Sequence, residues 1–340
     1  MEANKKIKVL IIRFSSIGDI VLCTPVLRCL KKIPGKEIEL HFLTKNKFAG
    51  FVKQNPNVDK VFALEKKLKD LLPQLKNQQY NYIIDLHNNI RSHLVKFYLQ
   101  KPSQSFSKLS FKKWLLTKAK IDLMPDVHIV DRYMAAAKGL GLENDGEGLD
   151  YFIPEADEVN IEKLPEPFQQ GYIAFVIGGT YVTKRLPQEK IASICKNLTQ
   201  PVVLLGGPED KETGEAIALQ LPEKVFNACG KFTLNGSASL VKQSTGVISH
   251  DTGLMHIAAA FDKPIASIWG NTTPELGMYP YFPENSTSHH SKIFEVKNLS
   301  CRPCSRIGYN ACPKKHFKCM HDIQEHDIVS WVENIRSVCP

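Results

Sequence analysis

A run of β-branched and small residues, Thr245 to Ser249, leads directly into Asp251-Thr252-Gly253 and then into a helix-forming segment. This order predicts a buried strand that feeds the start of a helix. Free backbone N–H groups at a helix start lie at the positive end of the helix dipole, where they are suited to hold phosphate oxygens. The stretch therefore indicates an α/β fold that binds a phosphorylated small ligand.

The candidate contacts for this ligand are Asp251, Thr252, Gly253, Leu254 and His256. Two plainer interpretations stay open at this point. Asp251 or Thr252 is alternatively a simple N-cap of the helix, and His256 is alternatively a histidine of the core.

A second junction between a strand and a helix lies near the N-terminus. The apolar run Lys8–Phe14 predicts a buried strand, and Ser15–Val21 predicts a tight turn into a helix that continues towards Lys31. Ligands of open α/β sheets bind outside the carboxyl ends of such strands, so we expect Gly18 and Asp19 to line a crevice. Asp19 is then either an acid/base group or a cap of the helix.

This junction differs from the common nucleotide-binding fingerprints. Gly18 stands alone, without the second and third glycines of the dinucleotide motif. The chain also lacks a Walker-type glycine–lysine loop. These differences argue against a simple dehydrogenase or ATPase.

Strand-like runs alternate with helix-like segments along the chain, which is typical of parallel sheets covered on both faces. The strands expected in the first half are Ile7–Phe14, Glu37–Leu43, Val58–Leu64 and Tyr80–Leu86. Those expected in the second half are Tyr172–Ile177, Val202–Leu205, Lys224–Phe226, Gly246–Ser249 and Pro264–Trp269. A linker with prolines and acidic residues lies around Gly146–Phe168. Because 340 residues exceed one ordinary core, we predict two Rossmann-like domains that face a central cleft.

Positive charge is concentrated in the first half of the chain. Residues 1–150 hold 26 Lys+Arg and 15 Asp+Glu, a net charge of +11, whereas residues 151–340 have a net charge of −2. The densest basic stretch is Lys108–Lys120, where aromatic and basic residues recur at roughly helical spacing. It is either a solvated helix or a surface for an anionic membrane. No nucleic-acid-binding module accompanies the charge, so we expect no nucleic-acid partner.

Nothing in the sequence resembles a signal peptide or a membrane span, because the longest apolar runs are strand-sized and interrupted. We therefore expect a cytoplasmic protein in which the nine cysteines are reduced thiols or metal ligands rather than disulfides. Four of them form a C-x2-C-x7-C-x6-C cluster, namely Cys301, Cys304, Cys312 and Cys319. The spacing favours packed thiols in a compact loop, with a structural zinc site as the alternative.

These motifs resemble glycosyltransferase family 9, the ADP-heptose:lipopolysaccharide heptosyltransferases. The similarity rests on the pattern Arg-x-Ser-Ser-x-Gly-Asp-x-Val from Arg13 and on Asp-Thr-Gly-Leu-Met-His-x-Ala-Ala-Ala from Asp251. Between them, residues 178–187 resemble the donor-phosphate loop of the family, and residues 85–92 resemble its acceptor-side strand end. The chain departs from the family at two positions: Leu186 stands where an aromatic residue is frequent, and Asn271 where a proline is common.

The resemblance implies the GT-B architecture and an inverting transfer of heptose from ADP-heptose to an inner-core lipopolysaccharide acceptor. Asp19 is the expected general base. The expected donor-binding residues are Thr180, Lys184, Glu209, Asp251, Thr252, Gly253, Leu254 and His256, and the expected acceptor-side residues are Gly18, Asp85, His87 and Arg91. Lys184 is expected at the diphosphate and Glu209 at the ribose hydroxyls, with Glu212 as the alternative to Glu209.

We expect an N-terminal acceptor-binding domain at residues 1–155, a C-terminal nucleotide-sugar-binding domain at 156–325, and a final helix at 326–340 that packs back on the first domain. No cofactor and no metal are expected at the site. The expected partners are a nucleotide-sugar donor, a glycolipid acceptor and the anionic cytoplasmic face of the inner membrane, with a monomeric enzyme associated peripherally. The alternatives are a transferase of another nucleotide sugar, a non-catalytic sugar-nucleotide-binding protein and a nucleotide-sugar epimerase.

Overall fold

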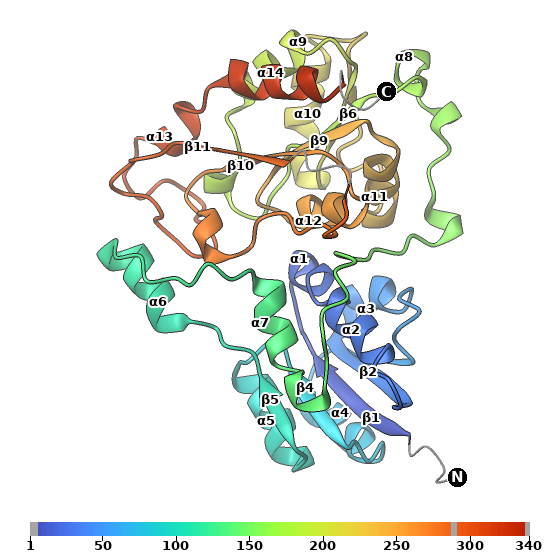
Figure 1. Ribbon diagram of the computed structural model, residues 1–340. Coiled ribbons are helices and arrows are strands. Elements are labelled where there is room, and N and C mark those ends of the chain that lie inside the picture. Colours follow the sequence, from blue (N-terminus) through green and yellow to red (C-terminus); the bar gives the residue numbers. More distant parts are fainter. Residues whose placement is uncertain (1–5, 287–290, 337–340) are drawn as a thin grey trace. The chain divides into compact units, whose positions relative to one another are not determined.

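The computed structural model describes residues 6–286 and 291–336, and these residues form two compact units. Unit 1 comprises Met1–Lys108 and Val127–Phe152, and unit 2 comprises Leu109–Asp126 and Ile153–Pro340. Each unit contains a parallel sheet with helices on both faces (Figure 1). The segment 109–126 therefore groups with the second unit, which differs from the expected division at residue 155.

The sheet of unit 1 has the strand order β3-β2-β1-β4-β5 and is parallel throughout. Its strands are β1 (Ile7–Ile12), β2 (Ile38–Lys45), β3 (Lys60–Leu64), β4 (Tyr82–Asp85) and β5 (Ser103–Ser105). The central strand β1 pairs Val9 with Leu40 of β2 and with Tyr82 of β4. Four of these strands confirm the expected ones, whereas β5 was not predicted.

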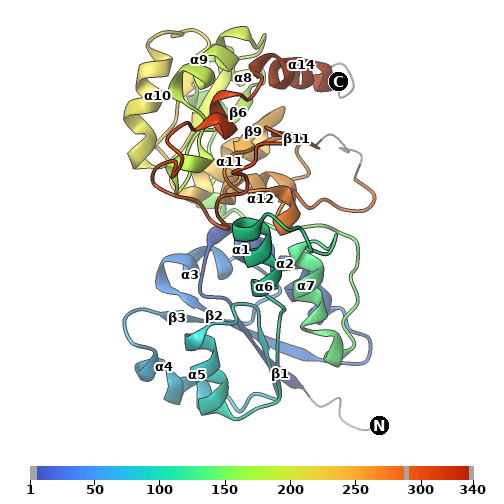
Figure 2. The same cartoon turned by 90° about the vertical axis from the view of Figure 1, so that its left-hand side faces the viewer.

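The helices of unit 1 are α1 (Ile17–Val21), α2 (Thr24–Lys31), α3 (Asn46–Val52), α4 (Leu68–Lys76), α5 (Ile90–Leu99), α7 (Ile129–Ala135) and the short η2 (Lys138–Leu140). Helices α4 and α5 lie side by side on one face of the sheet (Figures 1 and 2). Their buried residues, including Leu75 and Val95, share a cluster with Leu10 and Ile12 of β1. On the other face, α2 packs against α7.

The helix expected to run from the first turn towards Lys31 is divided in two. Helix α1 ends at Val21, and α2 starts at Thr24 with Pro25 in its first turn. Proline fits the first turn of a helix better than its interior, because it lacks the N–H that an interior position donates. Helix α1 is therefore a single short turn that holds Gly18 and Asp19 at the carboxyl end of β1.

The sheet of unit 2 has the strand order β11-β10-β9-β6-β7-β8. Its strands are β6 (Ile173–Val176), β7 (Val202–Leu205), β8 (Val225–Asn227), β9 (Gly246–His250), β10 (Ile265–Trp269) and β11 (Ser291–Glu295). The central strand β6 pairs Phe175 with Leu204 of β7 and with Ile248 of β9. All five expected strands of this half are confirmed, and β11 is added at the edge.

The helices of unit 2 are α6 (Ser110–Trp114), the π-helical η1 (Leu115–Ala119), η3 (Glu155–Asp157), η4 (Ile161–Lys163), α8 (Glu166–Gln169), η5 (Val182–Lys184), α9 (Gln188–Asn197), η6 (Pro208–Asp210), α10 (Lys211–Ala218), α11 (Leu234–Gln243), α12 (Gly253–Ala260), η7 (Pro274–Leu276), α13 (Lys318–His321) and α14 (Glu325–Arg336). Helix α9 packs against α10 and α14, and α11 packs against α12 on the opposite face (Figure 1).

The final helix buries its apolar face within unit 2. Ile328 and Val332 of α14 belong to the same core cluster as Ile191 and Ile194 of α9. This differs from the expected packing of the last segment on the N-terminal domain, and residues 337–340 of that segment lie outside the described residues. No helix within residues 6–286 and 291–336 is long and apolar enough to span a bilayer.

Candidate active site

The Asp19 carboxylate lies on α1, just beyond the carboxyl end of β1, and is held by several donors of unit 1. Arg13 Nη2 lies 2.6 Å from Oδ1, and the Tyr133 hydroxyl donates to the same oxygen at 3.3 Å. Ser16 donates to Oδ2 from its backbone N–H at 3.1 Å and from Oγ at 2.8 Å. The side chain is still 18% exposed, so the carboxylate is fixed in orientation and reachable.

These neighbours set the charge of Asp19. Burial acts to raise its pKa, but the Arg13 guanidinium and the hydrogen bonds from Ser16 outweigh burial and lower the pKa to about 2. Asp19 is therefore a carboxylate throughout the physiological pH range. It also acts as the acid of a capping box with Ser16, so its structural and chemical interpretations are compatible.

Arg13 is the residue of this half-site whose role the sequence did not reveal. Its side chain is 9% exposed, and Nε donates to the Ser15 carbonyl at 2.7 Å while Nη1 donates to the Leu86 carbonyl. A buried guanidinium requires an anionic partner. The sequence did contain a signal for the pairing of Arg13 with Asp19. Arg13 directly follows a strand of continuously apolar residues, and Asp19 is the next acidic residue along the chain.

Asp85 lies at the end of β4 and is completely buried. It accepts hydrogen bonds from the backbone of His87 and Asn88 at 3.0 and 2.6 Å and from Ser92 Oγ at 2.7 Å. Lys96 Nζ lies 3.0 Å from the same carboxylate. Its role is therefore to order the turn between β4 and α5, and its two oxygens are already occupied.

His87 and Arg91 are the expected acceptor-side residues with available polar groups. The His87 ring packs edge-on against Phe14 with centroids 5.3 Å apart. Burial and the positive charge of Arg13 lower the pKa of His87 to about 4, so the ring is neutral at physiological pH. Its Nδ1 is buried and has no partner among the described residues. Arg91 is exposed in the first turn of α5.

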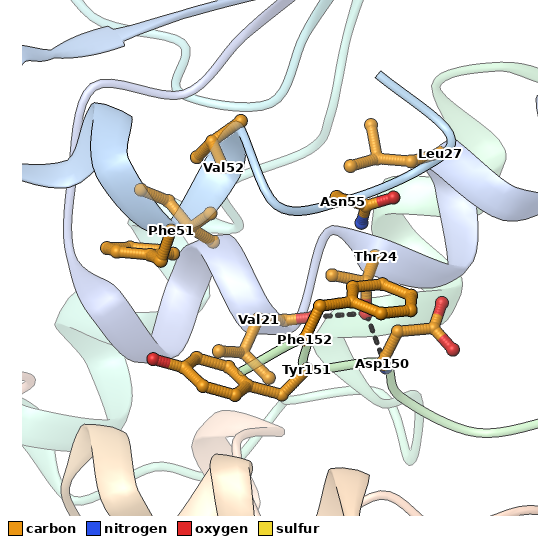
Figure 3. Close-up of a pocket in the computed structure, with 10 residues that line it drawn as sticks. Val21, Thr24, Leu27, Phe51, Val52, Asn55, Asp150, Tyr151 and Phe152 are labelled. Carbon is orange, nitrogen blue, oxygen red and sulfur yellow. Dashed lines mark hydrogen bonds between the residues drawn. The ribbon is translucent and has the colours of Figure 1, made fainter. Parts of the chain in front are cut away.

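A cavity of about 20 Å³ adjoins this half-site, between α1, α2 and α3 (Figure 3). Phe51 stacks on Tyr151 at its rim, with centroids 6.3 Å apart. Thr24 Oγ1 donates to the Val21 carbonyl at 2.7 Å and accepts from the Asp150 N–H at 2.8 Å. The enclosed space is about that of one water molecule.

In unit 2, the loops that follow β6 and β9 approach each other closely. A Cβ on Gly179 would lie 3.3 Å from Cγ2 of Thr252, and one on Gly178 would lie 2.5 Å from Oδ2 of Asp210. Glycine is therefore required at position 178, because a side chain there would displace the Asp210 carboxylate. The residues expected at the donor lie beyond the carboxyl ends of parallel strands: Thr180 and Lys184 follow β6, Glu209 follows β7, and Asp251 follows β9. Ligands of open α/β sheets bind at this edge.

Lys184 and Asp251 form an ion pair at this edge of the sheet. Lys184 Nζ lies 2.6 Å from Oδ2 of Asp251 and 3.2 Å from the Asp251 carbonyl oxygen. Thr272, which the sequence did not single out, donates from Oγ1 to the same carboxylate oxygen at 2.9 Å. The two side chains are 15% and 12% exposed, so the ammonium is positioned by Asp251 and remains accessible to a ligand.

The start of α12 has the properties expected of an anion site. Thr252 is the N-cap residue in an extended conformation, but its hydroxyl makes no capping hydrogen bond. The N–H groups of Gly253 and Leu254 in the first turn are therefore not capped by that side chain. His256 is 2% exposed, in agreement with the interpretation as a core histidine.

The turn after β7 carries three consecutive or nearby acidic residues with different surroundings. Glu209 and Glu212 are exposed, whereas Asp210 is buried between them. Arg185 Nη1 lies 2.8 Å from Oδ1 of Asp210, and the Gly207 N–H donates to Oδ2 at 2.8 Å. Asp210 therefore ties the β7 turn to the loop of Lys184, and Glu209 remains available for a ligand. Thr180 is exposed in the same loop.

The two departures from the family pattern have structural consequences. Leu186 is a core residue packed in the same cluster as Ile191, and its N–H donates to Nε2 of His250 at 3.0 Å. Asn271 is 1% exposed, and both polar atoms of its side chain have no partner among the described residues. Leaving such a group unsatisfied costs about 1–3 kcal/mol, so Asn271 is a second residue with unused hydrogen-bonding capacity near the site.

The cysteine cluster consists of free thiols. Cys301 Sγ lies 3.6 Å from Nε2 of His316, and burial raises the pKa of Cys304 to about 11 and that of Cys319 to about 12. Within residues 6–286 and 291–336, no group of three or more His, Cys, Asp or Glu side chains is arranged to hold a metal ion.

Comparison with protein families matches residues 69–311 to glycosyltransferase family 9 (heptosyltransferase). The chain is similar to lipopolysaccharide heptosyltransferase 1 of Campylobacter coli, with 26% identity over 96% of this chain and 98% of the relative. It is also similar to lipooligosaccharide heptosyltransferase 2 of Haemophilus influenzae, with 28% identity over 78% of this chain and 84% of the relative.

Solved structures show the same fold. A family 9 glycosyltransferase from Veillonella parvula has a TM-score of 0.73 at 21% identity and covers 96% of both chains. An E. coli heptosyltransferase solved with ADP has a TM-score of 0.68 at 21% identity, over 97% of this chain and 100% of the other. The GT-B fold expected from the sequence is therefore confirmed.

Proposed function

The chain belongs to glycosyltransferase family 9, the heptosyltransferases, and from this premise we propose that it transfers a heptose from ADP-heptose to an inner-core lipopolysaccharide acceptor with inversion of the anomeric centre. The observation that carries this proposal is the fixed, ionised and partly exposed carboxylate of Asp19. Such a group is what a direct displacement by a sugar hydroxyl needs, because the hydroxyl must lose a proton as it attacks.

The choice of ADP-heptose is supported by the relatives. One E. coli heptosyltransferase was solved with ADP and again with ADP-2-deoxy-2-fluoro heptose. The acceptor class is supported by relatives named lipopolysaccharide and lipooligosaccharide heptosyltransferases. In this chain, Lys184, Asp251 and the start of α12 lie at the carboxyl ends of the unit 2 strands, where they are suited to bind a diphosphate and a sugar.

In the proposed reaction, the acceptor hydroxyl oxygen attacks the anomeric carbon while the bond from that carbon to the diphosphate oxygen breaks. The proton of the hydroxyl passes to Oδ2 of Asp19, and the bonding electron pair leaves with ADP. An aspartate with a pKa of about 2 is a weak base towards an alcohol. It accepts the proton late, when bond formation has made the attacking oxygen acidic, and such assistance typically contributes about 10²–10⁴-fold.

The departing ADP acquires negative charge that unit 2 is equipped to stabilise. Lys184, positioned by Asp251, supplies a cation, and the first turn of α12 supplies backbone N–H groups at the positive end of its dipole. Glu209 contacts the ribose hydroxyls, and Thr180 contacts the diphosphate. His87 and Arg91 contact the acceptor from unit 1, whereas Asp85 orders the turn that carries His87 and leads into α5.

The proposal also places the enzyme as a monomer on the cytoplasmic face of the inner membrane. The support is the basic stretch 108–120, of which 110–119 is helical, with Phe111 70% and Trp114 52% exposed. Their rings stack 6.3 Å apart, beside Lys112 and Lys113. Aromatic and basic side chains on one short element suit the interface of an anionic leaflet.

A transfer assay tests the proposed function. The full chain is incubated with ADP-heptose and heptose-deficient lipopolysaccharide, and the acceptor mass is followed by mass spectrometry, with ADP-glucose and UDP-sugars as alternative donors. We expect one heptose to be added from ADP-heptose. A binding protein without turnover would leave the acceptor mass unchanged, and equal transfer from UDP-sugars would remove the ADP assignment.

Thermal unfolding provides a second readout of the donor. A ligand present at about 100 times its Kd adds about 2.7 kcal/mol to the free energy of unfolding. ADP and ADP-heptose should therefore stabilise the chain more than equal concentrations of UDP, GDP or NAD. Equal shifts from all nucleotides would contradict the donor assignment and leave the transferase class intact.

A further inference from the structure

Helix α5 of unit 1 carries a row of apolar side chains on its outward face. Ile90 is 81% exposed, Leu94 is 50% exposed and Phe97 is 79% exposed. At about 100° per residue, positions 90, 94 and 97 fall within a stripe about 60° wide. Tyr98, which is 37% exposed, lies beside this stripe.

The core does not account for this row. The inward face of α5 is formed by Ser92, Val95 and Leu99, which are buried, and Val95 and Leu99 pack in the cluster shared with α4 and β1. Figures 1 and 2 show α5 next to α4, with the sheet on the other side of both helices. Helix α5 is therefore apolar on two opposite faces, and only one of them is used in folding unit 1.

The part of the chain that forms α4 and α5 is strongly basic. From Lys66 to Lys108 the sequence holds eight Lys and Arg residues but two Asp residues. One of the two is Asp85, which is buried beside Lys96. The exposed cations of this stretch are Lys66, Lys67, Lys69, Lys76, Arg91 and Lys101. The Lys76 ammonium lies over the Tyr98 ring, 5.2 Å from its centroid, so charge and apolar surface are contiguous.

We propose that this surface, the outward face of α5 with its basic rim, docks on an anionic lipid bilayer. The apolar row enters the interface between headgroups and acyl chains, and the cations pair with lipid phosphates. A second copy of this chain is a poorer occupant, because the basic rims of the two copies would face each other.

This inference rests on the proposed function for its choice of a lipid surface, since the proposed acceptor is a glycolipid. It adds a docking element in unit 1 to the basic stretch 108–120 of unit 2. The turn that holds His87 leads directly into α5, and Arg91 lies in the first turn of that helix. Docking through α5 therefore holds the proposed acceptor side of unit 1 at the bilayer.

Vesicle co-sedimentation of the full chain, without donor or acceptor, tests the docking surface. The vesicles contain phosphatidylglycerol and phosphatidylethanolamine, and phosphatidylcholine vesicles serve as the neutral reference. The test variant is the double substitution Ile90→Ser and Phe97→Ser. The matched control is Leu219→Ser in unit 2, where the side chain is 73% exposed. A second test variant, Lys69→Glu with Lys101→Glu, addresses the charge.

We expect the apolar double variant to bind anionic vesicles at least tenfold more weakly, with unchanged thermal unfolding and an unaffected Leu219→Ser control. The charge variant should lose binding to anionic vesicles and show no change with neutral ones. Undiminished binding of both test variants would overturn the inference. The inference would also be overturned if the wild-type chain formed a dimer and the Ile90 and Phe97 variant were monomeric, because the α5 face would then bind a second copy of the chain.

Transfer to acceptor dispersed in detergent separates this inference from the proposed function. The Ile90 and Phe97 variant should transfer heptose at the wild-type rate in detergent, because these side chains do not contact substrates. If the Ile90 and Phe97 variant shows normal transfer and undiminished vesicle binding, only the docking surface is contradicted. If the wild-type chain binds vesicles through α5 but transfers no heptose, only the proposed function is contradicted.

Discussion

The guanidinium of Arg13 lies 2.6 Å from the carboxylate of Asp19, and this pair determines the protonation state of the proposed base. Arg13 occupies Oδ1, whereas Oδ2 accepts hydrogen bonds from the backbone N–H and the hydroxyl of Ser16 and is the proposed proton acceptor. The same contact that keeps Asp19 ionised also makes it a weaker base. The Asp19 carboxylate therefore has a fixed orientation but a lower basicity than a free aspartate.

Replacing Arg13 with Gln should raise the pKa of Asp19, because burial is then no longer opposed by the guanidinium. In the wild type, Asp19 stays ionised until the pH falls towards about 2, so it imposes no loss of activity above pH 4. In the variant, the acid limb of the profile of kcat/KM against pH should move upward, into the measurable range. Lys32→Gln, an exposed substitution in the same unit, is the control, and an unshifted limb would show that Arg13 does not tune Asp19.

Replacing Lys184 with Gln should lower kcat by about 10²-fold, since one preorganised group is lost where charge develops on the departing ADP. Affinity for ADP-heptose should fall less than kcat, because the ground state carries less charge at that oxygen. Steady-state kinetics combined with calorimetric donor binding distinguishes the two. Lys242→Gln is the matched control, because Lys242 also pairs with an acid, Glu158, but on the surface. If kcat stayed normal while only KM rose, Lys184 would be a binding residue alone.

Reversing Lys112 and Lys113 to Glu should weaken binding to anionic vesicles and raise the KM for the acceptor, with donor affinity unchanged. Like charges would then face the phosphates of the acceptor, and added salt should reduce the difference because exposed charges are screened over about 8–10 Å. Flotation assays at several salt concentrations measure the effect, with Lys211→Glu as the control. Unchanged vesicle binding, acceptor KM and salt dependence would leave α6 as a solvated helix.

Much of the fold was predictable because strands of a doubly covered parallel sheet are continuously apolar. The runs at Val9–Ile12 and Val202–Leu205 need both faces buried, whichever domain they occupy. The edge strand β5, Ser103–Ser105, has three polar residues and forms because the end of β4 is available to pair with it. The break between α1 and α2 was readable from Pro25 but was not expected.

The site was predictable in its positions and less so in its partners. Sequence position placed Asp19, Lys184 and Asp251 after strand ends, but it did not reveal that Arg13 pairs with Asp19 or that Lys184 pairs with Asp251 from another loop. Asp210 illustrates the limit: it directly follows Glu209, and only the direction of the short turn decides which of them is buried. Asp85 was expected at the acceptor from its position in a motif, but both of its carboxylate oxygens accept hydrogen bonds from within unit 1.

The central claim is that Asp19 accepts the proton of the attacking hydroxyl, and the Asp19→Asn variant tests it most directly. Asparagine preserves the size of the side chain and can still accept hydrogen bonds, but it cannot take the proton. Donor affinity should stay within about twofold of the wild type while kcat falls by about 10²-fold or more. Asp70→Asn, which changes an exposed carboxylate on α4, is the control.

Removing the partner of the buried Arg13 can also destabilise unit 1, so the rate must be measured on protein shown by thermal unfolding to be folded at the assay temperature. The decisive measurement is the kcat of this folded variant under saturating ADP-heptose and acceptor. If Asp19 is the base, turnover should fall by at least about 10²-fold while donor binding stays intact. A folded Asp19→Asn enzyme with near wild-type turnover would contradict it.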